Sequence, residues 1–145
     1  MKHFGIALVF SLAVALSGCG GGSSSSSAIN GNWTATLTGS QDLSFNVTLT
    51  QSGGVVSVTN LSFTTSQSCF DSGATATGAF TLMGTLNGVT TGSFQMTVQS
   101  GASNANGSNT LVLTGTLTNN SIAGNWTLSG SGLGCTGSGT FTMTG

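Results

Sequence analysis

Apolar and polar residues alternate along most of the chain after position 28, with the period of two that is typical of half-buried β-strands. Leu43, Phe45, Val47 and Leu49, for example, are separated by Ser, Asn and Thr. Threonine and serine at the intervening positions suit the wet face of a strand. Turn-forming residues divide this pattern into eight predicted strands, at 29–38, 43–51, 55–65, 74–86, 89–99, 110–118, 121–130 and 137–144.

The pair Asn119-Asn120 lies between two of these strands and suits a two-residue hairpin turn, which requires positive φ. Such a turn predicts that Thr118 pairs with Ser121. Both residues fall on the outward face of the alternation, so the turn and the strand pattern agree in register.

The pair Asn87-Gly88 predicts a second hairpin of the same type, in which Leu86 faces inward and pairs with Val89. The apolar residues later in the second strand have the opposite phase to Val89. We therefore expect one extra residue, a β-bulge, near Thr90-Thr91.

A glycine recurs two residues before an aromatic ring along the predicted strands. Residues two apart share one face of a strand, so small and large side chains alternate on the inner face, as a strongly coiled sheet needs. We predict an all-β fold, a single antiparallel up-and-down barrel of about eight strands; a two-sheet sandwich is the alternative. The core or ligand-facing residues are expected to be Trp33, Phe45, Phe80, Phe94, Met96, Trp126 and Phe141.

The stretch Gly31-Asn32-Trp33, which opens the first predicted strand, resembles the start of the calycins, the lipocalin and avidin-like barrels. The resemblance implies that Trp33 closes one end of the barrel core. It also implies that the barrel could hold a small apolar ligand.

The first residues form a short basic head and an apolar run, Phe4 to Leu16, which is too short to span a bilayer. Its length is that of a secretory signal core. The stretch Leu16-Ser17-Gly18-Cys19 resembles the lipobox of bacterial lipoproteins. The resemblance implies a diacylglycerol thioether on Cys19 as the new N-terminus, and an address in the cell envelope, at the outer membrane. The alternative is an ordinary signal peptide with an incidental cysteine.

Gly and Ser residues follow Cys19 and are typical of a flexible spacer. We therefore divide the chain into a lipoprotein signal peptide at 1–18, a lipidated cysteine and tether at 19–28, and a β-barrel domain at 29–145. The expected partner of Cys19 is the membrane itself.

Beyond the signal peptide the chain has no Lys, Arg, His, Glu, Tyr or Pro, and its only carboxylate side chains are Asp42 and Asp71. General acid–base catalysis normally uses His, paired carboxylates, Lys or Tyr, and the two aspartates lie in turn-like settings. We predict that the protein is not an enzyme, has no metal site and needs no cofactor. Nucleic-acid binding is excluded because no cationic group is available to displace counterions.

Cys69 and Cys135 remain once Cys19 is assigned to lipid, and the compartment permits oxidation. A disulfide between them would contribute about 4 kcal/mol by closing a long loop of the unfolded chain. In a meander of eight strands both cysteines fall in connections at the same end. Two buried free thiols are the alternative.

The most direct functional interpretation is a membrane-anchored cell-envelope lipoprotein with a structural or surface-interaction role, an expected monomer. Its possible partners are a small apolar ligand or another envelope protein. The first alternative is therefore a binding module that holds an apolar ligand inside the barrel. A more remote one is ice or carbohydrate binding through outward Thr-x-Thr faces, such as Thr34/Thr36/Thr38 and Thr140/Thr142/Thr144.

Overall fold

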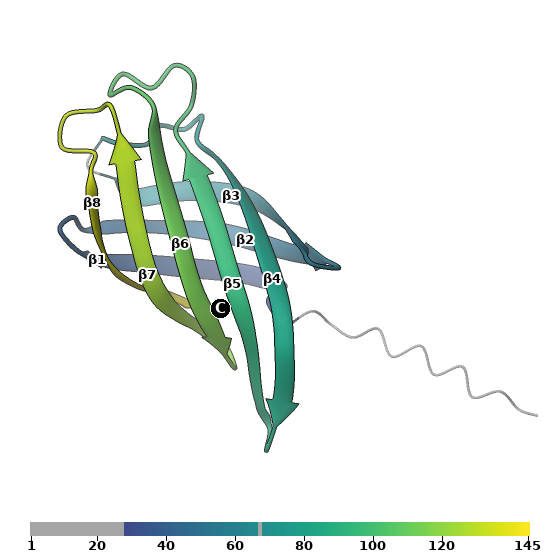
Figure 1. The fold of residues 1–145 in the computed structure, drawn as a ribbon. Coiled ribbons are helices and arrows are strands. Elements are labelled where there is room, and N and C mark those ends of the chain that lie inside the picture. The colour runs from purple at the N-terminus through teal and green to yellow at the C-terminus, as the bar shows by residue number, and fades with distance from the viewer. Residues whose placement is uncertain (1–27, 67) are drawn as a thin grey trace, which may run out of the picture.

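The computed structural model describes residues 28–66 and 68–145, and within them the chain forms eight consecutive strands (Figure 1). The predicted strands are confirmed, with bounds that differ by a residue or two at some ends. The strands are β1 Gly31–Gly39, β2 Leu43–Ser52, β3 Val55–Thr65, β4 Thr75–Leu86, β5 Val89–Gln99, β6 Asn109–Thr118, β7 Ser121–Gly130 and β8 Gly137–Thr144.

Each strand pairs antiparallel with its neighbours in the sequence, and β1 pairs with β8 to close the barrel. The closing ladder runs from Thr34 opposite Thr144 to Gly39 opposite Gly139. The predicted up-and-down barrel is therefore confirmed, and the sandwich alternative is wrong. Closure joins the two strands that would otherwise be the edges of the sheet.

The alternation of the sequence becomes the two faces of the barrel. In β1, for example, Trp33, Ala35 and Leu37 are buried while the threonines between them are exposed. The same period holds through β2 and β5 to β8, where the inward positions join one continuous apolar core. Burial of these side chains, roughly 1.5–3 kcal/mol each, is the main favourable term for folding.

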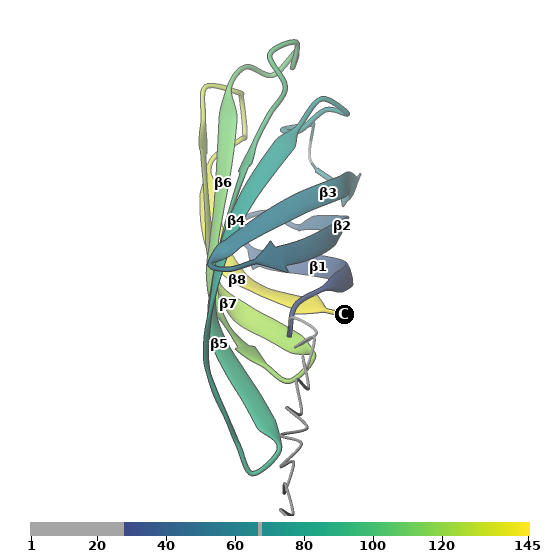
Figure 2. The same cartoon turned by 90° about the vertical axis from the view of Figure 1, so that its right-hand side faces the viewer.

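The ladder between β3 and β4 is much shorter than the others (Figure 2). Only Val55 to Ser57 pair with Thr77 to Ala79, because the two strands are staggered along the barrel axis. In the remainder of β3, Phe63 stacks on Phe70 with ring centroids 4.6 Å apart and lies 5.2 Å from Phe45. The part of β4 after Phe80 therefore has no strand neighbour on its β3 side.

The barrel has two different ends. The disulfide end carries the loops that follow β1, β3, β5 and β7. The hairpin end carries the short turns that follow β2, β4 and β6, and both the start of β1 and the C-terminus lie there as well. Two hydrogen bonds hold the chain ends at this end: the Gln51 amide donates to Asn30, and the Gly145 amide donates to Asn120.

The predicted hairpin pairings are confirmed, since Thr118 lies opposite Ser121 and Leu86 lies opposite Val89. Asn87 and Asn119 both have positive φ, as their turns require.

The predicted bulge exists in the β4–β5 hairpin but lies on the other strand. The ladder shifts between Leu82 and Gly84, so the extra residue is Met83 in β4 and not a residue near Thr90-Thr91 in β5. The expectation that Leu86 faces inward was wrong, because Leu86 and Val89 are both exposed. The alternation of β5 then continues without interruption through Gly92, Phe94 and the strand's later inward positions.

Candidate functional site

The seven residues predicted to form the core or face a ligand all lie inside the barrel, and none is more than 3% exposed. Both tryptophans also satisfy their indole N–H groups. Trp33 donates to the carbonyl of Ile29 at 2.8 Å, and Trp126 donates to the carbonyl of Thr38 at 3.1 Å. Trp33 packs near Gly145, at the hairpin end, where the chain enters the barrel.

The inward glycines do not leave empty space beside these rings. A Cβ atom added at Gly92 would lie 2.2 Å from the ring of Phe80, and one added at Gly115 would lie 2.9 Å from the ring of Phe141. At Gly78 the same atom would lie 3.1 Å from Val56. At these three glycines the omitted volume is thus occupied by a side chain of another strand, as the small-beside-large pattern predicts.

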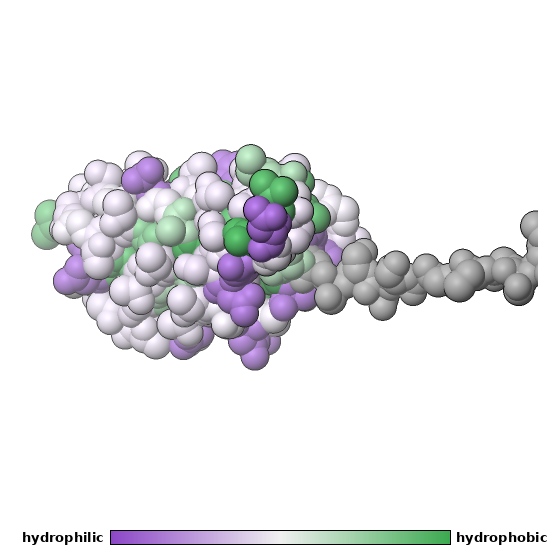
Figure 3. Space-filling view, turned by 90° about the horizontal axis from the view of Figure 1, so that it is seen from below, coloured by the Kyte–Doolittle hydropathy of each residue, from purple (hydrophilic) through white to green (hydrophobic). Residues whose placement is uncertain are grey.

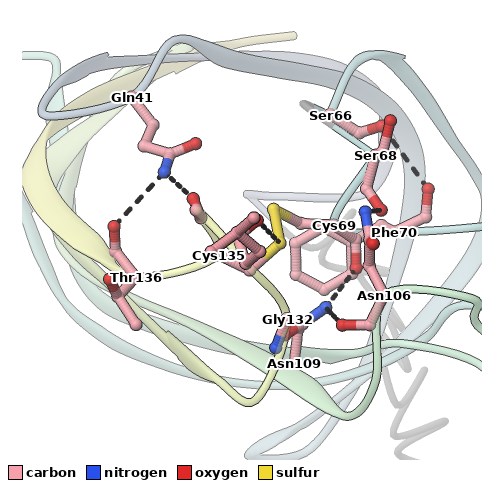
Figure 4. The surroundings of a disulfide bond; sticks show 12 residues. Gln41, Ser66, Ser68, Cys69, Phe70, Asn106, Asn109, Gly132, Cys135 and Thr136 are labelled. Atoms are coloured by element: carbon pink, nitrogen blue, oxygen red, sulfur yellow. Dashed lines mark hydrogen bonds between the residues drawn. A yellow bond between two sulfur atoms is a disulfide. The ribbon is translucent and has the colours of Figure 1, made fainter.

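The disulfide end is held together covalently and by amide side chains (Figure 4). Cys69 and Cys135 form a disulfide with a Cα–Cα distance of 5.5 Å, which confirms the predicted pairing, and both residues are fully buried. Asn109 is the buried polar residue beside them. Its side-chain amide donates to the carbonyls of Cys69 at 2.8 Å and Asn106 at 3.2 Å, and its oxygen accepts from the Gly132 amide at 3.3 Å.

Two further asparagines bind the same loops to one another. Asn104 donates to the Cys69 carbonyl at 2.9 Å, and Asn106 donates to the Ser68 carbonyl at 3.0 Å. Sequence reasoning missed this network. In the sequence, the network is visible only as Asn104, Asn106 and Asn109 in a polar stretch. Such a stretch is typical of an ordinary loop.

The two aspartates lie in different loops of the disulfide end. Asp71 accepts a hydrogen bond from the Gly101 amide at 3.0 Å, which joins the β3–β4 loop to the β5–β6 loop. Asp42 lines an open hollow of about 420 Å³ together with Gln41 and Leu133. Among residues 28–66 and 68–145, no group of three or more His, Cys, Asp or Glu side chains could hold a metal ion.

At the hairpin end, large apolar side chains are exposed. Leu82, Met83, Leu86 and Val89 belong to the β4–β5 hairpin, and an open hollow of about 380 Å³ lies against Met83, Leu86 and Val89. Sequence reasoning missed this cluster because it placed Leu86 in the core. The available signal was the succession Leu82-Met83, which breaks the alternation.

The outer face carries the threonine rows noted in the sequence. On β1 and β8 they form three directly opposed pairs, Thr34 with Thr144, Thr36 with Thr142 and Thr38 with Thr140. The last pair has its hydroxyl oxygens 3.3 Å apart.

Cys19, the predicted signal peptide and most of the predicted tether lie outside the described residues. In the part of the chain that the structure describes, no helix has the length and apolar character to cross a membrane. No protein-family model, curated protein or solved structure matches the chain.

Proposed function

We propose that this protein is a lipid-anchored lipoprotein of the cell envelope, attached to the outer membrane through Cys19, and that its barrel has a structural or surface-interaction role without catalysis. One observation carries the proposal. The chain has three cysteines, and Cys69 and Cys135 are joined to each other, which leaves Cys19, at the end of Leu16-Ser17-Gly18-Cys19, for another chemistry.

The disulfide supports an oxidising compartment as well, since such bonds persist in secreted and envelope proteins and are rare in the cytosol. The Gly and Ser residues after Cys19 have the composition of a spacer between a lipid and a folded body.

The chemistry of the barrel supports a non-catalytic role. Asp42 and Asp71 are its only carboxylate side chains; they come from different loops, and the Asp71 carboxylate already accepts a backbone amide. The interior supports a packed scaffold over a ligand cavity, because the rings of Phe80 and Phe141 fill the space beside Gly92 and Gly115. We therefore place any interaction of the barrel on its surface.

Metabolic labelling with radioactive palmitate tests the anchor. We expect the full-length protein to incorporate label and the Cys19→Ser variant to lose it, while the double variant Cys69→Ala/Cys135→Ala keeps it. Globomycin, which blocks lipoprotein processing, should make the precursor accumulate. Label that persists in Cys19→Ser would overturn the proposal.

A second candidate function is favoured by the opposed threonine pairs of β1 and β8. Rows of hydroxyl and methyl groups at the strand spacing could bind a regular surface, either ice or a carbohydrate. The triple variant Thr36→Lys/Thr140→Lys/Thr142→Lys should then abolish inhibition of ice recrystallisation or retention on polysaccharide. The matched triple variant Thr75→Lys/Thr77→Lys/Thr81→Lys, on the outer face of β4, should leave that activity intact.

A further inference from the structure

The β4–β5 hairpin extends beyond the strands on both of its sides as a two-stranded ribbon, which we define as residues 82–90 (Figure 1). On one side, β3 begins at Val55, opposite Ala79. On the other side, β6 ends at Thr118, opposite Thr91. The ribbon is therefore held at its base, where the Thr90 amide donates to the Asn119 side chain at 3.1 Å, and has no strand neighbour beyond it.

The exposed surface of the ribbon is apolar and carries no charge. Leu82 is 54% exposed, Met83 70%, Leu86 76% and Val89 38%, and its remaining side chains are Thr85, Asn87 and Thr90. In the view from below, hydrophobic atoms lie beside a hydrophilic residue on the central projection, and other hydrophobic patches lie elsewhere on a largely weakly polar surface (Figure 3). A two-stranded hairpin is at best marginally stable in water by itself, and clustered exposed apolar side chains mark interaction surfaces.

The ribbon projects from the end at which the N-terminal segment joins the barrel. The described chain begins at Ala28 and passes directly into β1 at Gly31, on the hairpin end. The two carboxylate side chains, Asp42 and Asp71, lie at the opposite end. A membrane that held Cys19 would thus face the end that has the exposed apolar ribbon and lacks the charged side chains.

The lengths are compatible with contact. The segment from Cys19 to Ala28 can span at most ~32 Å when fully extended. Strand β4 and its turn extend ~23 Å from Phe80, whose amide donates to the Gly54 carbonyl in the neighbouring hairpin, to the tip of the ribbon at Asn87. An anchor of this length allows the tip to reach the lipid headgroups.

We propose that the ribbon docks into the headgroup and acyl boundary of the lipid bilayer that carries the Cys19 anchor. This inference rests on the proposed lipid anchor. Leu82, Met83, Leu86 and Val89 leave water on docking, while Asn87 and the threonines stay at the level of the headgroups. The bilayer then holds the barrel at two points, and the disulfide end faces away from the membrane.

Fluorescence quenching by brominated lipids tests the docking. Leu86→Trp and Leu133→Trp place an exposed indole at opposite ends of the barrel, since Leu133 is 96% exposed at the disulfide end. Each full-length, lipidated variant is reconstituted into vesicles of phosphatidylethanolamine and phosphatidylglycerol with bromine at the upper acyl carbons. We expect quenching and a blue shift for the Leu86→Trp emission and neither for Leu133→Trp; the buried Trp33 and Trp126 provide a common background.

Adding Met83→Ser to Leu86→Trp should lower the docking equilibrium about tenfold. Adding Leu133→Ser, at an exposed position of the disulfide end, should leave it unchanged. Lipidation is measured separately, from the mass of the N-terminal peptide.

Three results would overturn the inference. If Cys19 carries lipid and the Leu86→Trp indole stays in water, the anchor stands and the docking fails. A blue shift that brominated lipid does not quench would mean that a second copy or another protein covers the ribbon. A peptide mass without lipid on Cys19 would remove the anchor, and with it the basis of the docking.

Discussion

At the disulfide end of the barrel, the Cys69–Cys135 bond and the side chain of Asn109 tie several loops to one another. At the hairpin end, the connections are short turns, and the β4–β5 ribbon carries its apolar side chains in the open. The same eight strands connect the two ends. The two ends therefore differ in their connections, which are cross-linked loops at one end and short turns at the other.

This contrast shows that the two ends of a barrel with almost no charged residues are stabilised in different ways. The long loops need cross-links because a loop without regular structure loses much conformational entropy when it is ordered. The short turns need none, since positive φ at Asn87 and Asn119 suffices to reverse the chain. The exposed apolar side chains of the β4–β5 hairpin are expected to contribute little to the stability of the fold, because they bury little surface.

The largest loss of stability is expected when the disulfide is removed. The double variant Cys69→Ala/Cys135→Ala should lose about 4 kcal/mol of unfolding free energy, because the unfolded chain regains the entropy of a long loop. Denaturant unfolding of the oxidised protein and the variant measures the difference. A loss below ~1 kcal/mol would show that the amide network alone holds this end.

The next effect compares two asparagines, one at each end. Asn109→Ala should cost ~2–3 kcal/mol, because it removes an amide that binds the buried carbonyl of Cys69 and leaves the Gly132 amide without its acceptor. Asn119→Gly, which keeps the positive φ of the turn and removes only the bond to Thr90, should cost about 0.5–1 kcal/mol. Thermal unfolding measures both. Equal losses would contradict the asymmetry between the ends.

A smaller effect tests the packing where the ribbon leaves the barrel. Gly92→Ala should cost about 1–3 kcal/mol, since the new methyl group would displace the Phe80 ring, 2.2 Å away. Gly54→Ala is the matched control, as nothing lies within 4 Å of its added Cβ. A neutral Gly92→Ala in denaturant unfolding would mean that the interior has room to spare and would favour a ligand-binding barrel.

The smallest effect concerns the ribbon itself. Met83→Ser/Leu86→Ser should change the unfolding free energy by no more than ~0.5 kcal/mol, because both side chains are already exposed. Denaturant unfolding of the vesicle-free protein provides the measurement. A loss of several kcal/mol would mean that these side chains stabilise the fold and are not reserved for a partner.

Much of the fold was predictable from the sequence, because period-two alternation and turn residues act locally. They determined the eight strands, the pairing of Thr118 with Ser121 and the barrel order. The disulfide followed from the number of cysteines and the meander. The candidate sites were harder to predict from the sequence. The Asn109 network joins residues that are distant in the chain, and nothing in the local pattern distinguishes Asn109 from a solvated loop residue.

By itself, the sequence determined which residues face inward along most strands, where the chain turns and which chemistries it lacks, since these depend on residue type and spacing. Only the tertiary structure decided where the bulge lies, how far β3 and β4 overlap and which residues remain uncovered. The stagger of the closed barrel leaves the end of β4 without a neighbour on its β3 side, and the extra residue, Met83, lies in this part of the strand. Leu86 is exposed because no apolar core lies beside it there. Alternation specifies the faces of a strand, but what covers a face depends on the strands that reach it.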